Sequence, residues 1–416
     1  MIMKFNIEQK VAGTLARAGR IETAHGVIDT PALTLAATKA TVKTLTPEEM
    51  RDLGAQSVLA NTYHLYLQPG DEIVKRAGGL HKFMHFDGPI FTDSGGFQAF
   101  SLGEAFGTGI SKFTSWERTD KVYEPSQHEK KAKVDDDGVT FYSHINGDEH
   151  RFTPERSIEI QHNLGADIIF AFDECVSPHA PREAHERAVE RTRLWAARCL
   201  VEHERLAGNT SLSRMSLGGR EQETGVPGQS SSLWGIVQGG RYEDLRRQSA
   251  REIAALDFEG FGIGGSFVKE DMGTAVRWVC EELPEEKPRH LLGVGEPADL
   301  FAGVENGIDT FDCVAATRKA RTGGMYTKDG EINITNAKYR EDFGPIEKGC
   351  ACYTCTNYSV AYVHHLFKSY ELLAYRLTTI HNLYFIVSLM KNIRSSILGG
   401  EFENFRNEFL ARFTSI

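Results

Sequence analysis

Short apolar runs alternate with longer amphipathic segments through most of this sequence. The amphipathic segments look helical and include Pro154–Asn163, Arg182–Arg205 and Tyr242–Ala255. Buried strands that alternate with helices form βα units, whose strands pair in a parallel sheet. Strands spread over roughly 250 residues favour a closed (β/α)8 barrel over a doubly wound sheet. The strand candidates are Ser57–Ala60, Pro89–Thr92, Ala166–Phe172, Leu233–Val237, Phe261–Ile263, His290–Leu292 and Ile308–Phe311.

Each of these runs is followed by a polar residue or a glycine. The carboxyl ends of barrel strands meet at one mouth, where barrel enzymes have their active sites. A single Asp after a strand is more often a helix cap or a turn residue. The whole set is harder to explain by capping, so we expect these residues to surround one pocket. They are Asn61, Asp93, Asp173, Gln238, Gly264, Gly265, Gly293 and Asp312.

The segment FTDSGGFQAF places Asp93 directly after a strand candidate. Ser94, Gly95 and Gly96 let the backbone turn tightly and offer N–H groups to a ligand. Phe97 can stack on a flat ring, although a position in the plain hydrophobic core is an equal alternative. This segment therefore predicts one wall of a binding site.

Asp312, in the segment GIDTFDC, is a second carboxylate at a strand end. Two carboxylates beside one sugar can split a glycosidic bond with retention, one attacking the anomeric carbon and the other handling the proton. Asp173 and Gln238 add an acceptor and an amide, which are groups that read a guanine edge. Cys313 is also a candidate nucleophile, but neighbouring side chains in a strand point apart. Together these residues predict a glycosidic reaction on a purine-like base.

A C-x-C-x2-C cluster in the last quarter of the sequence predicts a metal site. Three thiolates and one imidazole form a tetrahedral ligand set for zinc. Spacing alone leaves His364, His365 and His381 open as the fourth ligand. A catalytic zinc keeps one coordination position open for water, whereas four protein ligands close the site. A zinc deaminase also needs an H-x-E motif, which is not paired with this cluster. We therefore predict a structural Zn²⁺. The cysteines are Cys350, Cys352 and Cys355.

The 416 residues carry a net charge of −10, which by itself disfavours a nucleic-acid partner. From Cys313 onward, however, 13 Lys and Arg stand against 9 Asp and Glu. A polyanion could dock at this basic end, and chance asymmetry among solvated side chains explains the pattern equally well. The sequence starts without the apolar core of a secretion signal and has no run long enough to span a membrane. We therefore expect a cytoplasmic protein, which also suits the scattered remaining cysteines.

Polar and glycine-rich segments interrupt the alternation at residues 107–137 and 207–232. Both are predicted to be long loops, either lids at the barrel mouth or insertions without a role. We expect a catalytic barrel over residues 1–335 and a zinc-binding subdomain with C-terminal helices over residues 336–416. The amphipathic segment Val360–Arg394 would pack beside the metal.

Many motifs, in order, give the chain a family resemblance. It resembles the queuine/archaeosine tRNA-ribosyltransferases, and specifically the bacterial tRNA-guanine transglycosylases. The resemblance covers most of the chain outside the two loops and the extreme C-terminus. The matching segments are RIETAHGVIDTPA, LANTYHLYLQPG, GGLHKFMHFDGPIFTDSGGFQAFSLG, FAFDEC, WGIVQGG, HLLGVGEP, GIDTFDCVAATRKAR and CACYTC with its distant histidine.

The resemblance implies an enzyme of queuosine biosynthesis, which replaces the wobble guanine of tRNAs with a GUN anticodon by a 7-deazaguanine. It implies that Asp312 is the nucleophile of a covalent ribosyl-enzyme and that Asp93 is the proton acceptor. It also implies a homodimer, tRNA as the partner, and His381 as the fourth zinc ligand. Phe97 and Leu292 would sandwich the base. The implied substrate-binding set is Asp93, Ser94, Gly95, Gly96, Phe97, Asp173, Gln238, Gly264, Gly265 and Leu292.

Two further segments resemble the tRNA contacts of the family, one near the pocket and one at the anticodon. Glu270 resembles a carboxylate that steadies a peptide beside the pocket. The RNA-binding residues implied in this way are Gly293, Val294, Gly295, Glu296, Pro297, Ala298, Asp299, Thr317, Arg318, Lys319, Ala320 and Arg321.

The segment GGSFVKED departs from the family pattern directly after the glycine pair. Ser266 and Phe267 would line the place of the 7-substituent of the base. Cys175 and Val268 match enzymes that take preQ1, whereas Phe267 does not. PreQ1 is the expected base, with direct insertion of queuine as the alternative. A barrel nucleoside or glycoside hydrolase would use water instead, and a non-catalytic RNA-binding subunit would be expected to lack the carboxylates.

Overall fold

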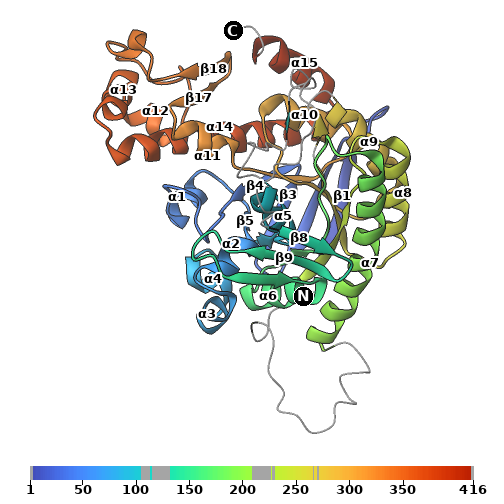
Figure 1. The fold of residues 1–416 in the computed structure, drawn as a ribbon. Helices are drawn as coiled ribbons and strands as arrows, with labels where there is room; N and C mark the ends of the chain where they lie inside the picture. Colours follow the sequence, from blue (N-terminus) through green and yellow to red (C-terminus); the bar gives the residue numbers. More distant parts are fainter. Residues whose placement is uncertain are drawn as a thin grey trace.

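A closed barrel of parallel strands forms the centre of the molecule in the computed structural model (Figure 1). The last barrel strand pairs with the first and closes the sheet. This arrangement confirms the predicted (β/α)8 barrel. In order around the barrel, the strands are β4 (Ala32–Ala36), β5 (Val58–Ala60), β6 (Ile90–Thr92), β11 (Ile168–Phe170), β12 (Ser232–Val237), β13 (Gly260–Ile263), β15 (Arg289–Leu291) and β16 (Thr310–Cys313).

The structure describes residues 3–104, 113–114, 132–208, 226, 230–265, 267–268 and 271–413. Most of the two predicted loops, at 107–137 and 207–232, lies outside these ranges, as do Ser266 and Glu270. Part of the first loop range is strand instead. Residues Phe113–Thr114 form β7, which pairs with β14 (Phe267–Val268), and residues Ala132–Asp135 form β8.

Three details of the strand prediction need correction. Strand β4 was not predicted, because its run ALTLA is short, contains the polar Thr34 and follows a proline. Strand β16 begins at Thr310 and includes Asp312, so this carboxylate lies inside the last strand rather than after it. Strand β15 ends at Leu291, which leaves Leu292 at the start of the following turn.

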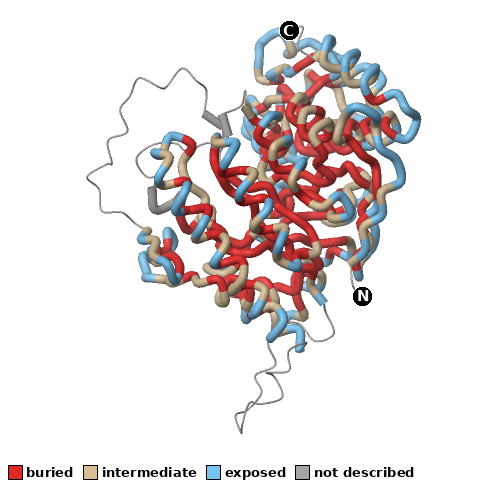
Figure 2. The backbone as a smooth tube through the Cα atoms, turned by 90° about the vertical axis from the view of Figure 1, so that its right-hand side faces the viewer, coloured by how far each residue is buried: buried red, intermediate tan, exposed pale blue. Residues whose placement is uncertain are grey.

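The helices that follow the strands surround the barrel, and buried residues are concentrated between the two layers (Figure 2). The three predicted helices are confirmed within one or two residues as α6 (Pro154–Leu164), α7 (Arg182–Leu206) and α8 (Glu243–Ala254). Thr153 caps α6 by accepting from the Arg156 N–H. The other helices of this part are α1 (Pro47–Asp52), α2 (Thr62–Leu67), α3 (Asp71–Arg76), α4 (Gly79–Met84), α5 (Gly96–Glu104), α9 (Met272–Glu282), α10 (Pro297–Glu305) and α11 (Ala315–Ala320).

Two small antiparallel sheets accompany the barrel. One consists of β1 (Lys4–Lys10), β2 (Arg17–Thr23) and β3 (Gly26–Thr30), and the other of β8, β9 (Gly138–Tyr142) and β10 (Glu149–Phe152). Arg17 of β2 forms a two-point ion pair with Asp309, which directly precedes β16. Both side chains are buried, at 2% and 0% exposure, so this pair ties the first sheet to the barrel.

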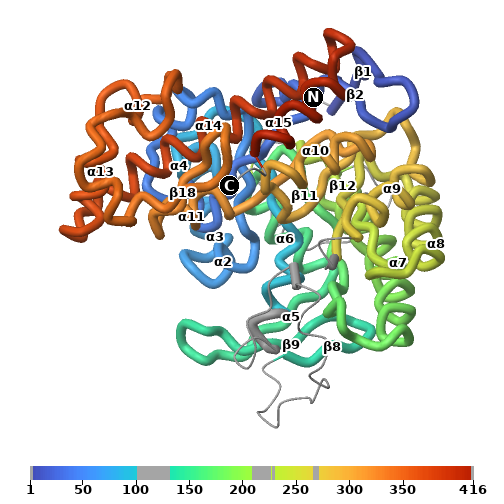
Figure 3. Tube along the Cα trace, turned by 90° about the horizontal axis from the view of Figure 1, so that it is seen from above, coloured from blue at the N-terminus to red at the C-terminus, as the bar shows by residue number. Residues whose placement is uncertain are grey.

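The C-terminal part lies at one side of the barrel and contains the hairpin of β17 (Gly324–Thr327) and β18 (Gly330–Asn333) (Figure 3). The 3-10 helix η4 (Ala337–Tyr339) follows the hairpin. The predicted segment Val360–Arg394 is two helices, because the chain turns at Tyr370 with a positive φ of 57°. The helices of this part are α12 (Tyr353–Asn357), α13 (Val360–Lys368), α14 (Leu372–Leu398) and α15 (Phe402–Phe413).

Helix α14 belongs to two hydrophobic cores. Its first part, with Ala374 and Leu377, packs in a small core with the cysteine cluster, and its later part joins the large barrel core. The division at residue 335 therefore stays a prediction, since one helix serves both sides. No helix among the described residues is both long and apolar enough to cross a membrane.

Candidate functional site at the barrel mouth

The predicted strand-end residues line one pocket at the mouth of the barrel, except Gly293, which instead donates its N–H to Asp312. Among the predicted substrate-binding residues, only Gly96 does not line it. Gly96 instead donates its N–H to the Ser94 hydroxyl and leaves no room for a side chain against the Asp173 carbonyl. The lining residues are Ala36, Thr38, Leu59, Asn61, His64, Asp93, Ser94, Gly95, Phe97, Gln98, Phe170, Asp173, Cys175, Ile236, Gln238, Gly264, Gly265, Leu292, Asp312 and Val314.

The start of α2 holds Asp93 in the pocket. The Thr62 N–H donates to Asp93 Oδ1 over 2.9 Å, and the Asn61 side-chain amide donates to Asp93 Oδ2. The Thr62 hydroxyl also donates to the Asp93 main-chain carbonyl. Asn61 at the end of β5 is therefore part of this site through its bond to the carboxylate, and the carboxyl plane is fixed by groups from a neighbouring βα unit.

Asp312 is held by two donors from the end of the neighbouring strand. The Gly293 N–H lies 2.7 Å from Asp312 Oδ1, and His290 Nε2 lies 3.2 Å from the same oxygen. The other ring nitrogen of His290 lies 2.9 Å from the Thr310 hydroxyl. Sequence reasoning missed His290. Strand alternation could have found it, because His290 lies two residues before the predicted Leu292.

Asp173 and Gln238 hydrogen-bond to each other, as well as facing the pocket. Gln238 Nε2 donates to Asp173 Oδ2 over 2.6 Å, and the Ser94 hydroxyl donates to Asp173 Oδ1 over 3.0 Å. Each carboxylate oxygen has two lone-pair directions, so acceptor capacity remains for a ligand. The residues predicted to read a purine edge therefore form one connected polar network.

A buried guanidinium supports the glycine pair. Arg246 Nη1 donates to the Gly264 carbonyl over 2.8 Å, and its Nε donates to the Gly240 carbonyl over 2.8 Å. Burial lowers the pKa of Arg246 to about 10, which leaves it charged at neutral pH. Sequence reasoning missed Arg246 as well, because an Arg in an amphipathic helix is normally solvated.

The thiol beside Asp312 is an unsuitable nucleophile. Burial raises the pKa of Cys313 to about 12, so the thiol stays protonated at neutral pH. Its sulfur instead accepts the N–H of Ala315 at the start of α11. This agrees with the expectation from strand alternation.

The predicted RNA-binding residues lie between β15 and the start of α10 and in and directly after α11, and most of them are buried or only partly exposed. Arg318 is exposed, whereas Lys319 is engaged by Glu296 at 2.8 Å and Glu331 at 2.6 Å. Arg321 donates to the Thr317 carbonyl over 2.9 Å. Packing, not solvent, surrounds the buried members, which are Val294, Gly295, Pro297, Asp299, Thr317 and Ala320.

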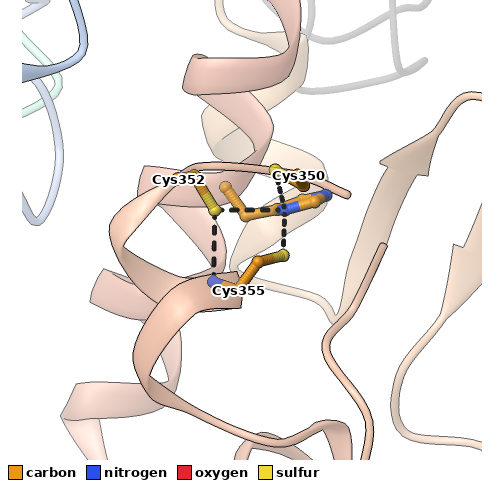
Figure 4. A group of neighbouring side chains, drawn as sticks. Cys350, Cys352 and Cys355 are labelled. Carbon is orange, nitrogen blue, oxygen red and sulfur yellow. Dashed lines mark hydrogen bonds between the residues drawn. The ribbon is translucent and has the colours of Figure 1, made fainter. Parts of the chain in front are cut away.

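The cysteine cluster selects His381 among the three histidines. The sulfurs of Cys350, Cys352 and Cys355 lie 3.9, 3.5 and 3.3 Å from His381 Nδ1. Figure 4 shows the three cysteine side chains converging on one point. Two ligands of a tetrahedral zinc ion would lie roughly 3.6 Å apart, given usual bond lengths. His364 instead contacts the Ile334 carbonyl at 2.8 Å.

A second group with metal-binding side chains lies at the opposite end of the barrel strands, where Asp167 precedes β11. Its two oxygens contact His25 Nδ1 at 2.7 Å and His81 Nε2 at 3.1 Å. The two rings stack at 3.6 Å with an angle of 21°. Ligand lone pairs lie in the ring plane, so two stacked rings cannot both point at one ion. We interpret this group as a hydrogen-bonded cluster.

Comparison with known proteins gives the family. The family model for queuine tRNA-ribosyltransferase matches residues 12–108 and 104–415. The queuine tRNA-ribosyltransferase of Pelotomaculum thermopropionicum is 46% identical, covering 99% of both chains. Those of Desulforamulus reducens and Roseiflexus sp. are 45% and 46% identical, covering 100% and 99% of this chain and 100% of each relative. The chain therefore belongs to the queuine tRNA-ribosyltransferase family, as its motifs had indicated.

Proposed function

We propose that this chain is a tRNA-guanine transglycosylase of queuosine biosynthesis, exchanging the wobble guanine of GUN-anticodon tRNAs for a 7-deazaguanine. The proposal rests on one pocket, whose lining includes both Asp93 and Asp312 and the hydrogen-bonded pair of Asp173 and Gln238. Such an exchange needs three parts: one carboxylate that attacks the sugar, one carboxylate that transfers a proton, and a polar network that recognises the base.

The first half of the reaction forms a covalent intermediate. A carboxylate oxygen of Asp312 attacks C1′ of the wobble ribose, and the bond from C1′ to the guanine nitrogen breaks. The electron pair of that bond leaves with guanine, whose ring nitrogen takes the proton of the Asp93 carboxyl group. The phosphate backbone is not touched, so the tRNA stays intact on Asp312 as a ribosyl ester.

The second half reverses these roles. Asp93 accepts the ring N–H proton of the incoming base, whose nitrogen then attacks C1′. The ester bond breaks and its electron pair returns to Asp312. The hydrogen bonds from Asn61 and Thr62 hold the Asp93 carboxylate in place as the proton acceptor for this step.

The base would lie between Phe97 and Leu292, which both line the pocket. Asp173 and Gln238 would accept from and donate to its guanine-like edge, with the backbone of Gly264 and Gly265 beside it. Discrimination is strong for such a site, because a wrong base leaves buried polar groups unpaired. PreQ1 is the proposed incoming base, since Cys175 lines the pocket as in enzymes that take it.

We also propose a structural Zn²⁺ held by Cys350, Cys352, Cys355 and His381. The four ligand atoms lie within 4.8 Å of one another, and four protein ligands leave no position for a substrate. His381 Nε2 lies 2.8 Å from the Tyr326 carbonyl, the kind of outer contact that fixes the orientation of a metal-binding histidine. The zinc ion would hold the small core together and supply no chemistry at the pocket.

The tRNA would dock with α11 beside the pocket mouth, where Arg318 is exposed. The anticodon base must leave its stack to reach Asp312. A homodimer working in the cytoplasm completes the proposal, with one subunit catalysing and the other helping to hold the tRNA. Size-exclusion chromatography with light scattering measures the oligomeric state directly.

The decisive experiment measures release of radiolabelled guanine from the wobble position of tRNA. Added preQ1 should drive release from the wild-type protein, whereas release with queuine alone would establish the salvage reaction instead. The Asp312→Ala and Asp312→Asn variants should neither exchange guanine nor form an RNA adduct that survives denaturation. Cys313→Ala is the matched control and should do both. An adduct that persists in Asp312→Ala contradicts the assignment of the nucleophile.

A further inference from the structure

His290 is buried in the barrel with one ring nitrogen against the proposed nucleophile. Its side chain is 0% exposed, and its ring lies 5.5 Å from the Phe91 ring and 5.4 Å from the Phe170 ring, measured between centroids. His290 Nε2 reaches Asp312 Oδ1 at 3.2 Å, while Nδ1 contacts the Thr310 hydroxyl at 2.9 Å. The ring does not line the pocket, so it acts on substrate only through Asp312.

The partners of the ring fix which nitrogen carries hydrogen. A carboxylate oxygen only accepts, so His290 Nε2 must donate to Asp312. The Thr310 hydroxyl can donate to a bare Nδ1 or accept from a protonated one. In either charge state of the ring, therefore, the Nε2–H points at Asp312 Oδ1. The aromatic neighbours keep water from competing for this bond.

Both donors, His290 Nε2 and the Gly293 N–H, meet the same oxygen of Asp312. These two bonds fix the plane of the carboxyl group, and we take Oδ2 as the oxygen that attacks C1′. When Oδ2 forms the ester, Oδ1 becomes its carbonyl oxygen and loses its negative charge. Hydrogen bonds to an ionised acceptor are about twice as strong as those to a neutral one. The His290 bond therefore favours the free carboxylate over the ester.

We propose that His290 is a positioning residue that speeds the second half of the exchange, by stabilising the Asp312 carboxylate as the incoming base expels it. The inference rests on the proposed function and deepens it. The bond between Oδ2 and C1′ breaks, its electron pair returns to the carboxylate, and the Nε2–H meets the returning charge on Oδ1. No proton of His290 is transferred in this step.

Two nearly isosteric variants separate the hydrogen bond from the packing. In His290→Gln the side-chain amide replaces Nε2 as a donor, whereas His290→Met fills the same space without one. The RNA adduct is formed on enzyme with tRNA, chased with excess guanine and followed on denaturing gels. We expect the chase of His290→Met to be roughly tenfold slower, the difference between a charged and a neutral hydrogen bond. His290→Gln should chase within about threefold of wild type, and KM for tRNA should be unchanged in both.

The Thr310 hydroxyl gives a second test, should His290→Met fail to fold. Thr310→Val removes the partner of Nδ1 and should slow the chase, whereas Thr310→Ser keeps the hydroxyl and should not. The inference is overturned if the RNA adduct of His290→Met is chased at the wild-type rate. It is also overturned if the adduct of His290→Gln is chased as slowly as that of His290→Met. A wild-type protein that forms no adduct and exchanges no guanine would instead refute the proposed function.

Discussion

A partly buried pair of histidines between α6 and α7 should make the fold sensitive to mild acid. His162 Nε2 lies 3.0 Å from His203 Nδ1, so one ring donates to the other and the accepting nitrogen carries no proton. Burial lowers the pKa of His162 to about 3 and that of His203 to about 4. In the unfolded chain a histidine titrates near pH 6.5.

The direction in which stability changes with pH follows from these pKa values. Below about pH 6.5 the unfolded chain binds protons that the folded protein refuses, so stability is complete above that pH and falls as pH drops toward 4. Between pH 7.5 and 5 each histidine lowers the free energy of unfolding by up to about 2 kcal/mol, and the pair lowers it by about 2 to 4 kcal/mol. Because α6 also carries Ser157, whose hydroxyl donates to the Ser94 carbonyl over 2.7 Å, loosening α6 would reach the pocket.

The assay is urea unfolding at pH 7.5 and at pH 5, for wild type and for the double variant His162→Gln/His203→Gln. The amide pair can still hydrogen-bond but cannot take up protons in this range. We expect the free energy of unfolding of wild type to fall by about 2 to 4 kcal/mol more than that of the variant. An equal fall in both proteins would refute the reasoning, because it would assign the acid sensitivity to other groups.

Other expectations concern the barrel end, the thiol and the metal. Asp309→Asn should lower the free energy of unfolding by about 3 to 5 kcal/mol, because it leaves Arg17 buried without its counter-charge. The double variant Arg17→Met/Asp309→Asn should lose less than Asp309→Asn alone in the same denaturant titration, and a larger loss would contradict this. Cys313→Ser should retain guanine exchange and its pH profile between pH 6 and 9, since the thiol stays protonated. Cys355→Ser, or a strong chelator on wild type, should lower the melting temperature and tRNA binding measured by filter retention, while unchanged melting would count against a metal-held core.

The sequence predicted the fold and most of the pocket because both depend on local pattern. Each apolar run is short and stands before a polar residue, so the position of Asp93, Asp173 and Gln238 could be read without the structure. Strand β4 was not predicted because its apolar run is short and is interrupted by a polar residue. The boundary at β16 shifted because strand pairing continues through Asp312, where the side chain is polar but the backbone still pairs with Thr34.

Residues that act through other residues were missed, although strand alternation could have indicated His290. His290 stands inside an apolar run, where a histidine is normally a satisfied core residue. Arg246 sits in a helix whose other charged residues face solvent. Spacing alone could not choose His381 over His364; the family resemblance indicated His381, and the structure places His381 against the sulfurs and His364 against the Ile334 carbonyl.

Helix α14 joins the cysteine cluster to α11 through two consecutive residues. His381 contributes to the cluster, and the next residue, Asn382, donates to the carbonyls of Ala316 and Gly324 and accepts the Tyr326 N–H. Ala316 lies in α11, two residues before the exposed Arg318. A shift at the cluster would thus reach α11 through the hydrogen bonds of Asn382, and none of these bonds involves Asp93, Asp173 or Asp312. If the cluster holds the proposed Zn²⁺, a shortage of metal in the cell would then appear as weakened capture of tRNA, with the chemistry of each captured tRNA unchanged.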